Sequence, residues 1–270
     1  MPAIYSAVPE ADRVVQEQLA DVLERRLAEP AQRAMRESFH DELTLPPSAR
    51  VLEVGCGTGA IARMLAARAD VAAVVGLDQS LVFLERARRL AADIPTVSFM
   101  PGDAHMLPFA DGVFDLVMFS TSLSHIVDAK AALGEAQRVL DVHGQVAIFD
   151  GDYATTTVCV GEDDPLGACA DAWVGRYVGN RWLFRELPAL MRATGFDVAL
   201  QRTYVYVENT SPSYMLTIVD RGADVLAASE RIGAELAAAL KTEARRRAVA
   251  GRFVGRIDYG GVIARKARPV

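Results

Sequence analysis

The stretch VLEVGCGTGAIARMLAARADVAAVVGLD, residues 51–78, decides the fold. A short apolar run leads into Gly55, Gly57 and Gly59, an amphipathic segment follows, and a second apolar run ends on Asp78. Glycines at a strand-to-helix turn let the backbone approach a ligand closely, and the helix beyond them offers free N–H groups. The pattern predicts a β-α-β unit that binds a nucleotide-like ligand.

Strands and helices alternate on both sides of this unit. Short apolar runs predict strands, and apolar residues at helical spacing predict the helices between them. The expected strands are 51–55, 73–78, 96–100, 114–119 and 145–150, and the expected helices are 59–68, 80–92 and 129–140. This alternation is typical of a parallel sheet wound with helices.

The flanking segments extend this core. We expect an amphipathic helix over 10–28, a break at Leu45-Pro46-Pro47-Ser48, a helix over 182–195, a strand over 198–207, helical structure over 213–250 and a final strand pair or bent strand over 253–265. The expected fold class is α/β, with a single Rossmann-like doubly wound sheet of about seven strands. The sheet should be mostly parallel with an antiparallel C-terminal strand, and a helical lid should be added to it.

Composition and charge exclude several classes of protein. The net charge of −6 and the pI near 5.3 give no reason to approach a polyanion, so no nucleic-acid partner is expected. Cys56, Cys159 and Cys169 form no CxxC pair and the four histidines show no HxxxH spacing, so we expect reduced thiols and no metal. The N-terminus does not resemble a signal peptide and no 18-residue apolar stretch occurs, which favours a cytoplasmic protein without membrane insertion.

The glycine loop alone does not distinguish two kinds of cofactor. Gly55 to Ala60 also fits the dinucleotide fingerprint, and Asp78 would accept hydrogen bonds from ribose hydroxyls in either case. Glu53 separates the two, because a carboxylate there would repel a pyrophosphate but orient the ammonium end of an amino-acid tail. The residues therefore favour S-adenosylmethionine.

Glu53-Val-Gly-Cys-Gly-Thr-Gly59 resembles motif I of class I S-adenosylmethionine-dependent methyltransferases. The resemblance is to the small-molecule branch, similar to the ubiquinone and menaquinone biosynthesis C-methyltransferases. It continues in order along the chain over about residues 48–151, through Gly102-Asp103-Ala104, Leu107-Pro-Phe-Ala-Asp-Gly-Val-Phe-Asp115, Ser124-His125-Ile-Val-Asp128 and Gly144-Gln-Val-Ala-Ile148. The chain departs from the family pattern at His105, where an acidic residue is usual, and at Asp141-Val142-His143, where the family has a Lys-Pro-Gly turn.

The resemblance implies S-adenosyl-L-methionine as cofactor and a set of residues around it. Asp78 would meet the ribose and Asp103 the adenine amino group, and the alternatives are a helix cap at Asp78 and a turn residue at Asp103. The implied cofactor-binding residues are Glu53, Gly55, Gly57, Gly59, Asp78, Gln79, Asp103, Ala104 and Ser120.

Three residues are candidates for catalysis. His125 could act as a base near neutral pH, and a packing role below the cofactor is the alternative. Asp152 and Tyr153 could orient an acceptor, or simply begin the lid. Methyl transfer demands mainly alignment and exclusion of water, so no catalytic triad is expected.

One domain is expected over 1–270, because neither a repeat nor a low-complexity linker occurs. Its parts would be an N-terminal helical cap (1–47), a cofactor-binding core (48–151), an acceptor lid (152–195), and C-terminal strands and helix that complete the sheet (196–270). The lid, the segment around Tyr5 and the strand near 204–206 should wall the acceptor pocket. The candidate lining residues are Tyr153, Trp173, Tyr177, Trp182, Tyr204, Tyr206 and Tyr214.

The expected function is S-adenosylmethionine-dependent methylation of a small, apolar or aromatic metabolite. A non-methylating cyclisation or rearrangement that uses the same cofactor is the main alternative, and an NAD-dependent oxidoreductase is a weaker one because of Glu53. Arsenite methylation is disfavoured because Cys56 lies in the glycine loop and no fourth thiol exists. The sequence leaves open the acceptor, its methylated atom, the pathway and a homodimer.

Overall fold

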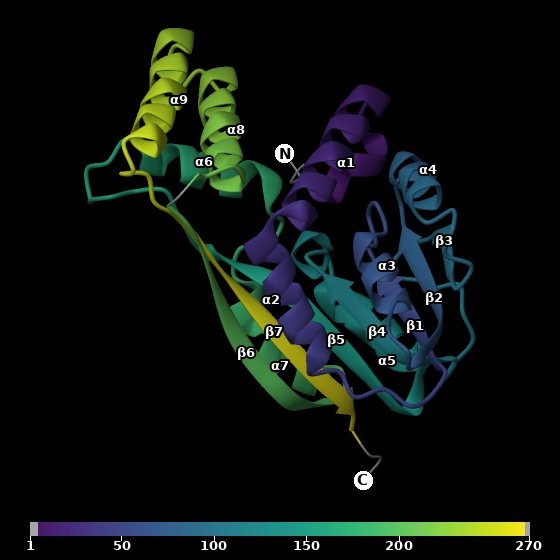
Figure 1. Ribbon diagram of the computed structural model, residues 1–270. Helices are drawn as coiled ribbons and strands as arrows, with labels where there is room; N and C mark the ends of the chain where they lie inside the picture. Colours follow the sequence, from purple (N-terminus) through teal and green to yellow (C-terminus); the bar gives the residue numbers. More distant parts are fainter. Residues whose placement is uncertain (1–4, 210, 268–270) are drawn as a thin grey trace.

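A computed structural model describes residues 5–209 and 211–267, and a seven-stranded sheet lies at its centre (Figure 1). The strand order is β3-β2-β1-β4-β5-β7-β6. The strands are β1 (Ala49–Val54), β2 (Val71–Asp78), β3 (Val97–Pro101), β4 (Phe114–Ser120), β5 (Leu140–Thr157), β6 (Phe196–Glu208) and β7 (Gly255–Lys266). β1 to β5 pair in parallel, whereas β7 runs antiparallel between β5 and β6. The expected α/β sheet with an antiparallel C-terminal strand is confirmed.

Helices cover both faces of this sheet and extend beyond it (Figure 1). The α-helices are α1 (Arg13–Ala28), α2 (Pro30–Asp41), α3 (Ala60–Ala66), α4 (Leu81–Leu90), α5 (Ala129–Val139), α6 (Leu166–Tyr177), α7 (Leu183–Ala193), α8 (Tyr214–Ala228) and α9 (Ala234–Val249). Two 3-10 helices, η1 (Tyr5–Glu10) and η2 (Leu123–His125), precede α1 and α5. In the described part of the chain, no helix is long and apolar enough to cross a membrane.

The two faces of the sheet form separate apolar cores. α2 and α3 pack on one face, and α5 and α7 pack on the other. β7 shows how closely both layers approach, since a Cβ on Gly260 would lie 1.7 Å from the Phe184 ring of α7. A Cβ on the next residue, Gly261, would lie 2.6 Å from the Phe39 ring of α2. Two adjacent glycines therefore let helices approach β7 from opposite sides.

The sequence pattern did not reveal α2. Pro30 occupies its first turn, and the Glu29 side chain accepts hydrogen bonds from the N–H groups of Ala31 and Gln32. Proline is compatible with this position because the first N–H groups of a helix have no partner within the helix. α2 follows α1 with Glu29 alone between them, and it carries Arg36 onto the sheet.

β5 is longer than the apolar run 145–150 predicts. It continues to Thr157 because β7 supplies antiparallel partners, such as Asp258 for Asp152 and Arg256 for Thr157. The expected lid therefore begins as strand, and its later part folds as α6 and α7. α8 crosses α6 so closely that a Cβ on Gly222 would lie 1.9 Å from the Cys169 carbonyl oxygen. With α9, these helices rise beyond one end of the sheet (Figure 1).

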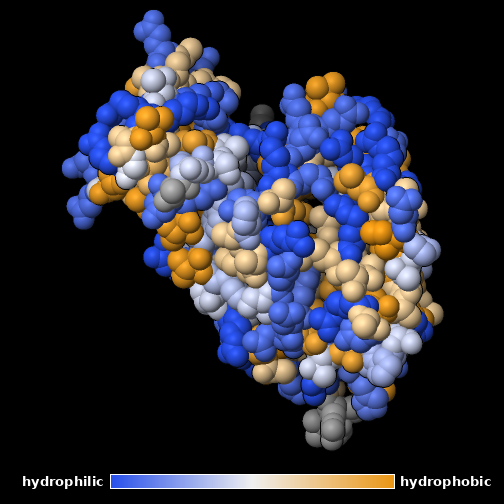
Figure 2. Space-filling model, viewed as in Figure 1, coloured by the Kyte–Doolittle hydropathy of each residue, from blue (hydrophilic) through white to orange (hydrophobic). Residues whose placement is uncertain are grey.

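Three ion pairs join α1 to the helices beside it. Arg13 lies 2.6 Å from Glu85 of α4, Arg86 of α4 lies 3.3 Å from Asp21, and Arg63 of α3 lies 3.0 Å from Glu24. Figure 2 shows a mainly hydrophilic surface over α1 and α4, where such pairs are expected. The pairs hold α1 across the end of the sheet.

Candidate active site

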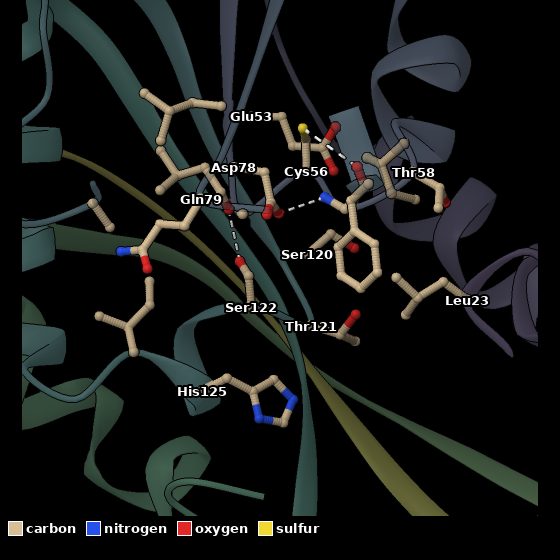
Figure 3. Close-up of a pocket in the computed structure, with 18 of the residues that line it drawn as sticks. Leu23, Glu53, Cys56, Thr58, Asp78, Gln79, Ser120, Thr121, Ser122 and His125 are labelled. Carbon is tan, nitrogen blue, oxygen red and sulfur yellow. Dashed lines mark hydrogen bonds between the residues drawn. The ribbon is translucent and has the colours of Figure 1, made fainter. Parts of the chain in front are cut away.

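The carboxyl ends of β1, β2 and β4 open into a cavity of about 280 Å³, which we call the large cavity. The strand order reverses between β1 and β4, and ligands bind at such switch points in open α/β sheets. Helices α1 and α2 complete its wall with Leu23, Arg26, Leu27 and Arg36. In Figure 3, Glu53 and Asp78 lie at one end of the view and His125 at the other.

The glycine loop needs its glycines. Gly55, Gly57 and Gly59 have φ angles of 71°, 53° and 72°, which residues other than glycine rarely adopt. A Cβ on Gly55 would lie 2.6 Å from the Ser122 Cβ, and one on Gly59 would lie 2.4 Å from the Phe99 ring. The loop is thus a bare backbone surface at the start of α3.

Asp78 holds this loop in place. Its Oδ2 accepts a 2.8 Å hydrogen bond from the Gly57 N–H (Figure 3), and its Oδ1 accepts one of 2.9 Å from the Ser80 N–H. Burial raises the pKa of the Asp78 carboxyl, and these N–H groups oppose that shift. Asp78 therefore has a structural role in addition to any contact with a ligand.

Glu53 and Ser120 present buried acceptors at the β1 and β4 ends. Glu53 is 2% exposed, accepts a hydrogen bond from the Ala62 N–H in the first turn of α3, and has a pKa that burial raises well above its usual value. Its Oε2 and the Ser120 Oγ have no hydrogen-bond partner in the described chain. Such acceptors fit a ligand that brings its own donors, such as the ammonium group of an amino acid.

The end of β3 supplies a polar rim. Asp103 Oδ1 accepts a 2.9 Å hydrogen bond from the His105 N–H and lies 2.7 Å from the His105 ring Nδ1. The His105 N–H is also the main reason why the pKa of Asp103 is lowered. Gln79, Ala104 and His105 border the cavity beside Asp103. His105, where the chain departs from the family pattern, is therefore part of the wall.

The structure brings most of the expected cofactor residues to one wall. Gly59 is the exception, since it is the N-cap of α3 and does not border the cavity. The residues on the wall are Glu53, Gly55, Gly57, Asp78, Gln79, Asp103, Ala104 and Ser120.

Thr121 and Ser122 complete this wall, and sequence reasoning missed both. Thr121 has a φ of 52°, its N–H donates to the Phe149 carbonyl, and its Oγ1 accepts a 2.6 Å hydrogen bond from Arg26. The Ser122 hydroxyl donates to the Val54 carbonyl (2.8 Å; Figure 3). Their position just after β4 was an available signal. No local pattern could have revealed Arg26 or Arg36, because the packing of α1 and α2 brings them here.

His125 borders the large cavity at the end of η2. Asp150 anchors this turn, since its carboxylate accepts hydrogen bonds from the Ser124 N–H (3.0 Å) and hydroxyl (2.9 Å). Burial of the imidazole, with a smaller contribution from the charge of Arg26, lowers the pKa of His125 to about 3. Its imidazole is therefore neutral and a weak base at physiological pH.

A second cavity of about 30 Å³, which we call the small cavity, adjoins the first. It shares Leu23, Arg26, Thr121 and His125 with the large cavity. Its other lining residues are Val22, Tyr153, Trp173, Tyr214, Thr217 and Arg221. The joined cavities run from the glycine loop to the aromatic residues of β5, α6 and α8.

Three of the aromatic residues expected around an acceptor meet here. Tyr153 lies between His125 (6.2 Å between ring centroids) and Trp173 (6.1 Å), and Tyr214 completes the group. Tyr177 stands behind this wall, stacked on Trp173 at 5.9 Å.

The other expected residues lie apart from both cavities. Asp152 pairs with Arg185 at 3.3 Å, and Trp182 is 47% exposed beside the same arginine. Tyr204 packs on Phe149, and Tyr206 donates a 2.5 Å hydrogen bond to Glu208. The side chain of Tyr5 lies outside the described residues.

Residues 52–148 match the family described as "Methyltransferase domain". Over these residues the chain is therefore similar to a methyltransferase domain, in agreement with the ordered motifs. The glycine surface and the buried acceptors of Glu53 and Ser120 fit S-adenosylmethionine.

The demethylmenaquinone methyltransferase of Mycolicibacterium vanbaalenii is 37% identical over 175 residues, which cover 65% of this chain and 65% of that protein. The chain spans about half to two thirds of the length of the curated relatives it matches. The solved structure of the [4+2]-cyclase SpnF shares the fold over 100% of this chain and 99% of its own, with a TM-score of 0.64 and 22% identity. Geranyl diphosphate C-methyltransferase from Streptomyces coelicolor, solved with S-adenosylhomocysteine, shares it over 87% and 81%, with a TM-score of 0.55 and 17% identity.

Proposed function

We propose that this protein transfers the methyl group of S-adenosylmethionine to a small organic acceptor held between the two cavities. The arrangement that carries the proposal is a cavity at the strand switch point, lined by the glycine loop and by Glu53, Asp78 and Asp103, that shares a wall with an aromatic one. Residues 48–151 provide the cofactor side in this proposal. The cap, 1–47, and the lid, 152–195, enclose the acceptor.

Each end of the large cavity suits a different part of the cofactor. Glu53 and Ser120 would hold the amino-acid end, Asp78 the ribose, and Asp103 with Ala104 the adenine. Gly55 and Gly57 would allow the close approach of the backbone. When bound, the cofactor supplies an activated methyl group.

The remaining work of the protein is positioning and exclusion of water. Val22, Leu23 and Trp173 give the acceptor side an apolar wall, and Tyr153 provides a ring that is 1% exposed. Aromatic walls favour a flat apolar acceptor through stacking and burial. The relatives named for demethylmenaquinone are consistent with an aromatic acceptor.

We assign His125 a positioning role in this reaction. A side chain whose pKa is about 3 stays neutral, and it borders both cavities where cofactor and acceptor would meet. Tyr153 would support it from behind. Asp152 pairs with Arg185 outside both walls, so we do not assign it a part in the reaction.

Calorimetry with S-adenosylhomocysteine tests the cofactor part of the proposal. Asp78→Asn should weaken binding by about 10- to 100-fold, since loss of a charge-assisted hydrogen bond costs about 1.5–3 kcal/mol. Asp197→Asn, on the exposed side of β6, is the matched control and should bind as the parent does. Absence of binding to the parent protein would refute the assignment.

Incubation with methyl-labelled cofactor and metabolite pools tests the reaction. Label in a small product, with equimolar S-adenosylhomocysteine, is the expected result. Conversion of a metabolite without S-adenosylhomocysteine would instead establish a non-methylating cyclisation or rearrangement.

A further inference from the structure

Arg36 of α2 is a buried cation at the junction of the sheet and the large cavity. It is 1% exposed, and its guanidinium carbon lies 5.3 Å from the centre of the Phe149 ring and 5.9 Å from that of Tyr259. Burial and the nearby charge of Arg26 lower the pKa of Arg36 to about 10, so it remains protonated at neutral pH. The structure therefore places a positive charge deep in the wall.

Only one edge of this guanidinium is occupied in the described chain. Nη1 donates to the Gln32 carbonyl oxygen (2.8 Å) and to the Gln32 side-chain oxygen (2.9 Å). Nε and Nη2, which form the other edge, have no hydrogen-bond partner among the described residues. A buried cation with unsatisfied donors is unfavourable unless an anion pairs with it. Two parallel donors on one edge match the two oxygens of a carboxylate.

The groups that perturb the pKa of Arg36 include no such anion, since they are Arg26, Tyr259, Tyr153 and Tyr214. Arg36 itself borders the large cavity, and three of these neighbours, Arg26, Tyr153 and Tyr214, line the small one. Arg26 and Arg221 are the charged residues that line the small cavity, and none of its described lining residues is a carboxylate. Asp150 lies deeper, where Ser124 and Gly151 already donate to it. The acceptor side of the joined cavities is thus positive, whereas the opposite side carries the carboxyl groups of Glu53, Asp78 and Asp103.

A bound cofactor also has a carboxylate, and Arg36 borders the large cavity, but its electrostatic neighbours Tyr153 and Tyr214 line the small one. The charged groups that perturb the pKa of Glu53 are Asp78 and Arg63, whereas Arg26, Tyr259, Tyr153 and Tyr214 perturb that of Arg36. Glu53 and Arg36 therefore interact with different sets of residues. Phe149, under Arg36, is on β5, and Glu53 is on β1 with β4 between them, so about 10 Å separates the two strands at usual strand spacing.

We propose that the acceptor is an organic anion whose carboxylate is held by the free edge of Arg36, with Arg26 beside it. This inference rests on the proposed function and narrows it, because it adds a charged group to the apolar or aromatic body proposed for the acceptor. The methylated atom would then lie on a molecule anchored at its acidic end.

Matched pairs of probes test the inference on the protein saturated with S-adenosylhomocysteine. The probes are 2-naphthoate, 3-phenylpropanoate and decanoate, each beside its primary amide, with dissociation constants measured by calorimetry. At least one acid should bind about 10- to 100-fold more tightly than its amide, because hydrogen bonds to charged groups are stronger than neutral ones. If no acid is preferred over its amide, including the case that neither binds, the inference is wrong.

Arg36→Met should remove the preference for the acid and leave the amide unaffected. It should also leave the melting temperature of the ligand-free protein unchanged or higher, since a desolvated cation is replaced by an apolar chain of similar length. Arg33→Met, on the exposed side of the same helix, is the control and should keep the preference. Arg36→Lys keeps the positive charge but lacks the paired donors of the guanidinium. It should weaken binding of the acid and leave binding of the amide unchanged, and it provides the test if the methionine variant folds poorly.

Binding of S-adenosylhomocysteine separates the two sources of carboxylate. Its affinity should change less than threefold in Arg36→Met. If the affinity falls, while that of 5′-methylthioadenosine, which lacks the amino-acid end, does not, Arg36 pairs with the cofactor and the inference is refuted. If the parent protein binds no S-adenosylhomocysteine, the proposed function fails, whereas the comparison of acid with amide, repeated without it, still decides the role of Arg36.

Discussion

His125 borders both cavities, and its surroundings lower its pKa to about 3. An imidazole of this kind does not titrate between pH 6 and 8, so it should not shape the pH profile of turnover there. We expect His125→Ala to reduce turnover by about 10- to 100-fold through misplacement of the reactants. Affinity for S-adenosylhomocysteine should stay within threefold, and the pH profile should keep its shape. If turnover of the parent instead falls below about pH 6.5 and this fall is absent from the variant, His125 acts as a base.

Local sequence predicted the cofactor side at the scale of residues because its signals are local. Gly55 and Asp78 belong to one β-α-β unit, so their spacing alone brings them together, and the Gly57–Asp78 hydrogen bond confirms that closeness. Arg26 and Arg36 carry no comparable signal, since surface arginines on amphipathic helices look the same in sequence. Their positions depend on how α1 and α2 pack on the rest of the chain.

The close packing of α7 on β7 at Gly260 can be tested by a substitution. Gly260 faces α7, where an added methyl would lie 1.7 Å from the Phe184 ring. Gly260→Ala should lower the free energy of unfolding by about 1–3 kcal/mol, since overpacking forces a ring or the strand to move. Urea unfolding provides the measurement. Gly161→Ala, where no atom lies within 4 Å of the added Cβ, should have little effect, and equal stability of the two variants would contradict the proposed layering.

Helices and strands with a regular apolar pattern were predictable from the sequence. Those whose extent depends on pairing with a distant strand were not. The central strands appear in the sequence as apolar runs, and β7 and the helical segment 213–250 were expected where they occur. β5 exceeds its apolar run because β7 pairs with the extra residues, as at Asp152 and Asp258. That pairing makes Tyr153 a strand residue with a fixed direction, although the sequence indicated a loop there.

His40 of α2 makes the whole molecule sensitive to acid. It is 5% exposed, and burial, with the charges of Arg36 and Arg68, lowers its pKa to about 4. The unfolded chain takes up a proton near pH 6.5 but the folded chain does not until about pH 4, so stability is full above 6.5 and falls as the pH drops through this window. The contribution of His40 is at most about 3 kcal/mol, or about 1.36 kcal/mol for each unit of difference.

Chemical unfolding at pH 7.5, 5.5 and 4.5 measures this effect. His40→Gln should lose less stability than the parent between the first and last of these values. His143→Gln, at an exposed position near the start of β5, should follow the parent. If the two variants and the parent show the same slope, His40 does not contribute to the acid sensitivity.

The ion pairs of α1 have a kinetic consequence for the molecule. Leu23 and Leu27 of α1 wall the large cavity, so we expect a ligand bound there to leave when this helix moves away from α3 and α4. Leu19 and Ala20 pack α1 on Phe83 of α4, and the exposed pair of Arg13 with Glu85 adds a contribution that salt screens. The residence time of the ligand should therefore depend on ionic strength even where its affinity hardly does.

Raising salt from about 0.05 to about 0.5 M should accelerate dissociation of S-adenosylhomocysteine by about 3- to 10-fold if the three pairs contribute about 1 kcal/mol together. Glu85→Gln should dissociate faster at low salt and respond less to added salt, and a rate independent of salt would mean that the ligand leaves by another route.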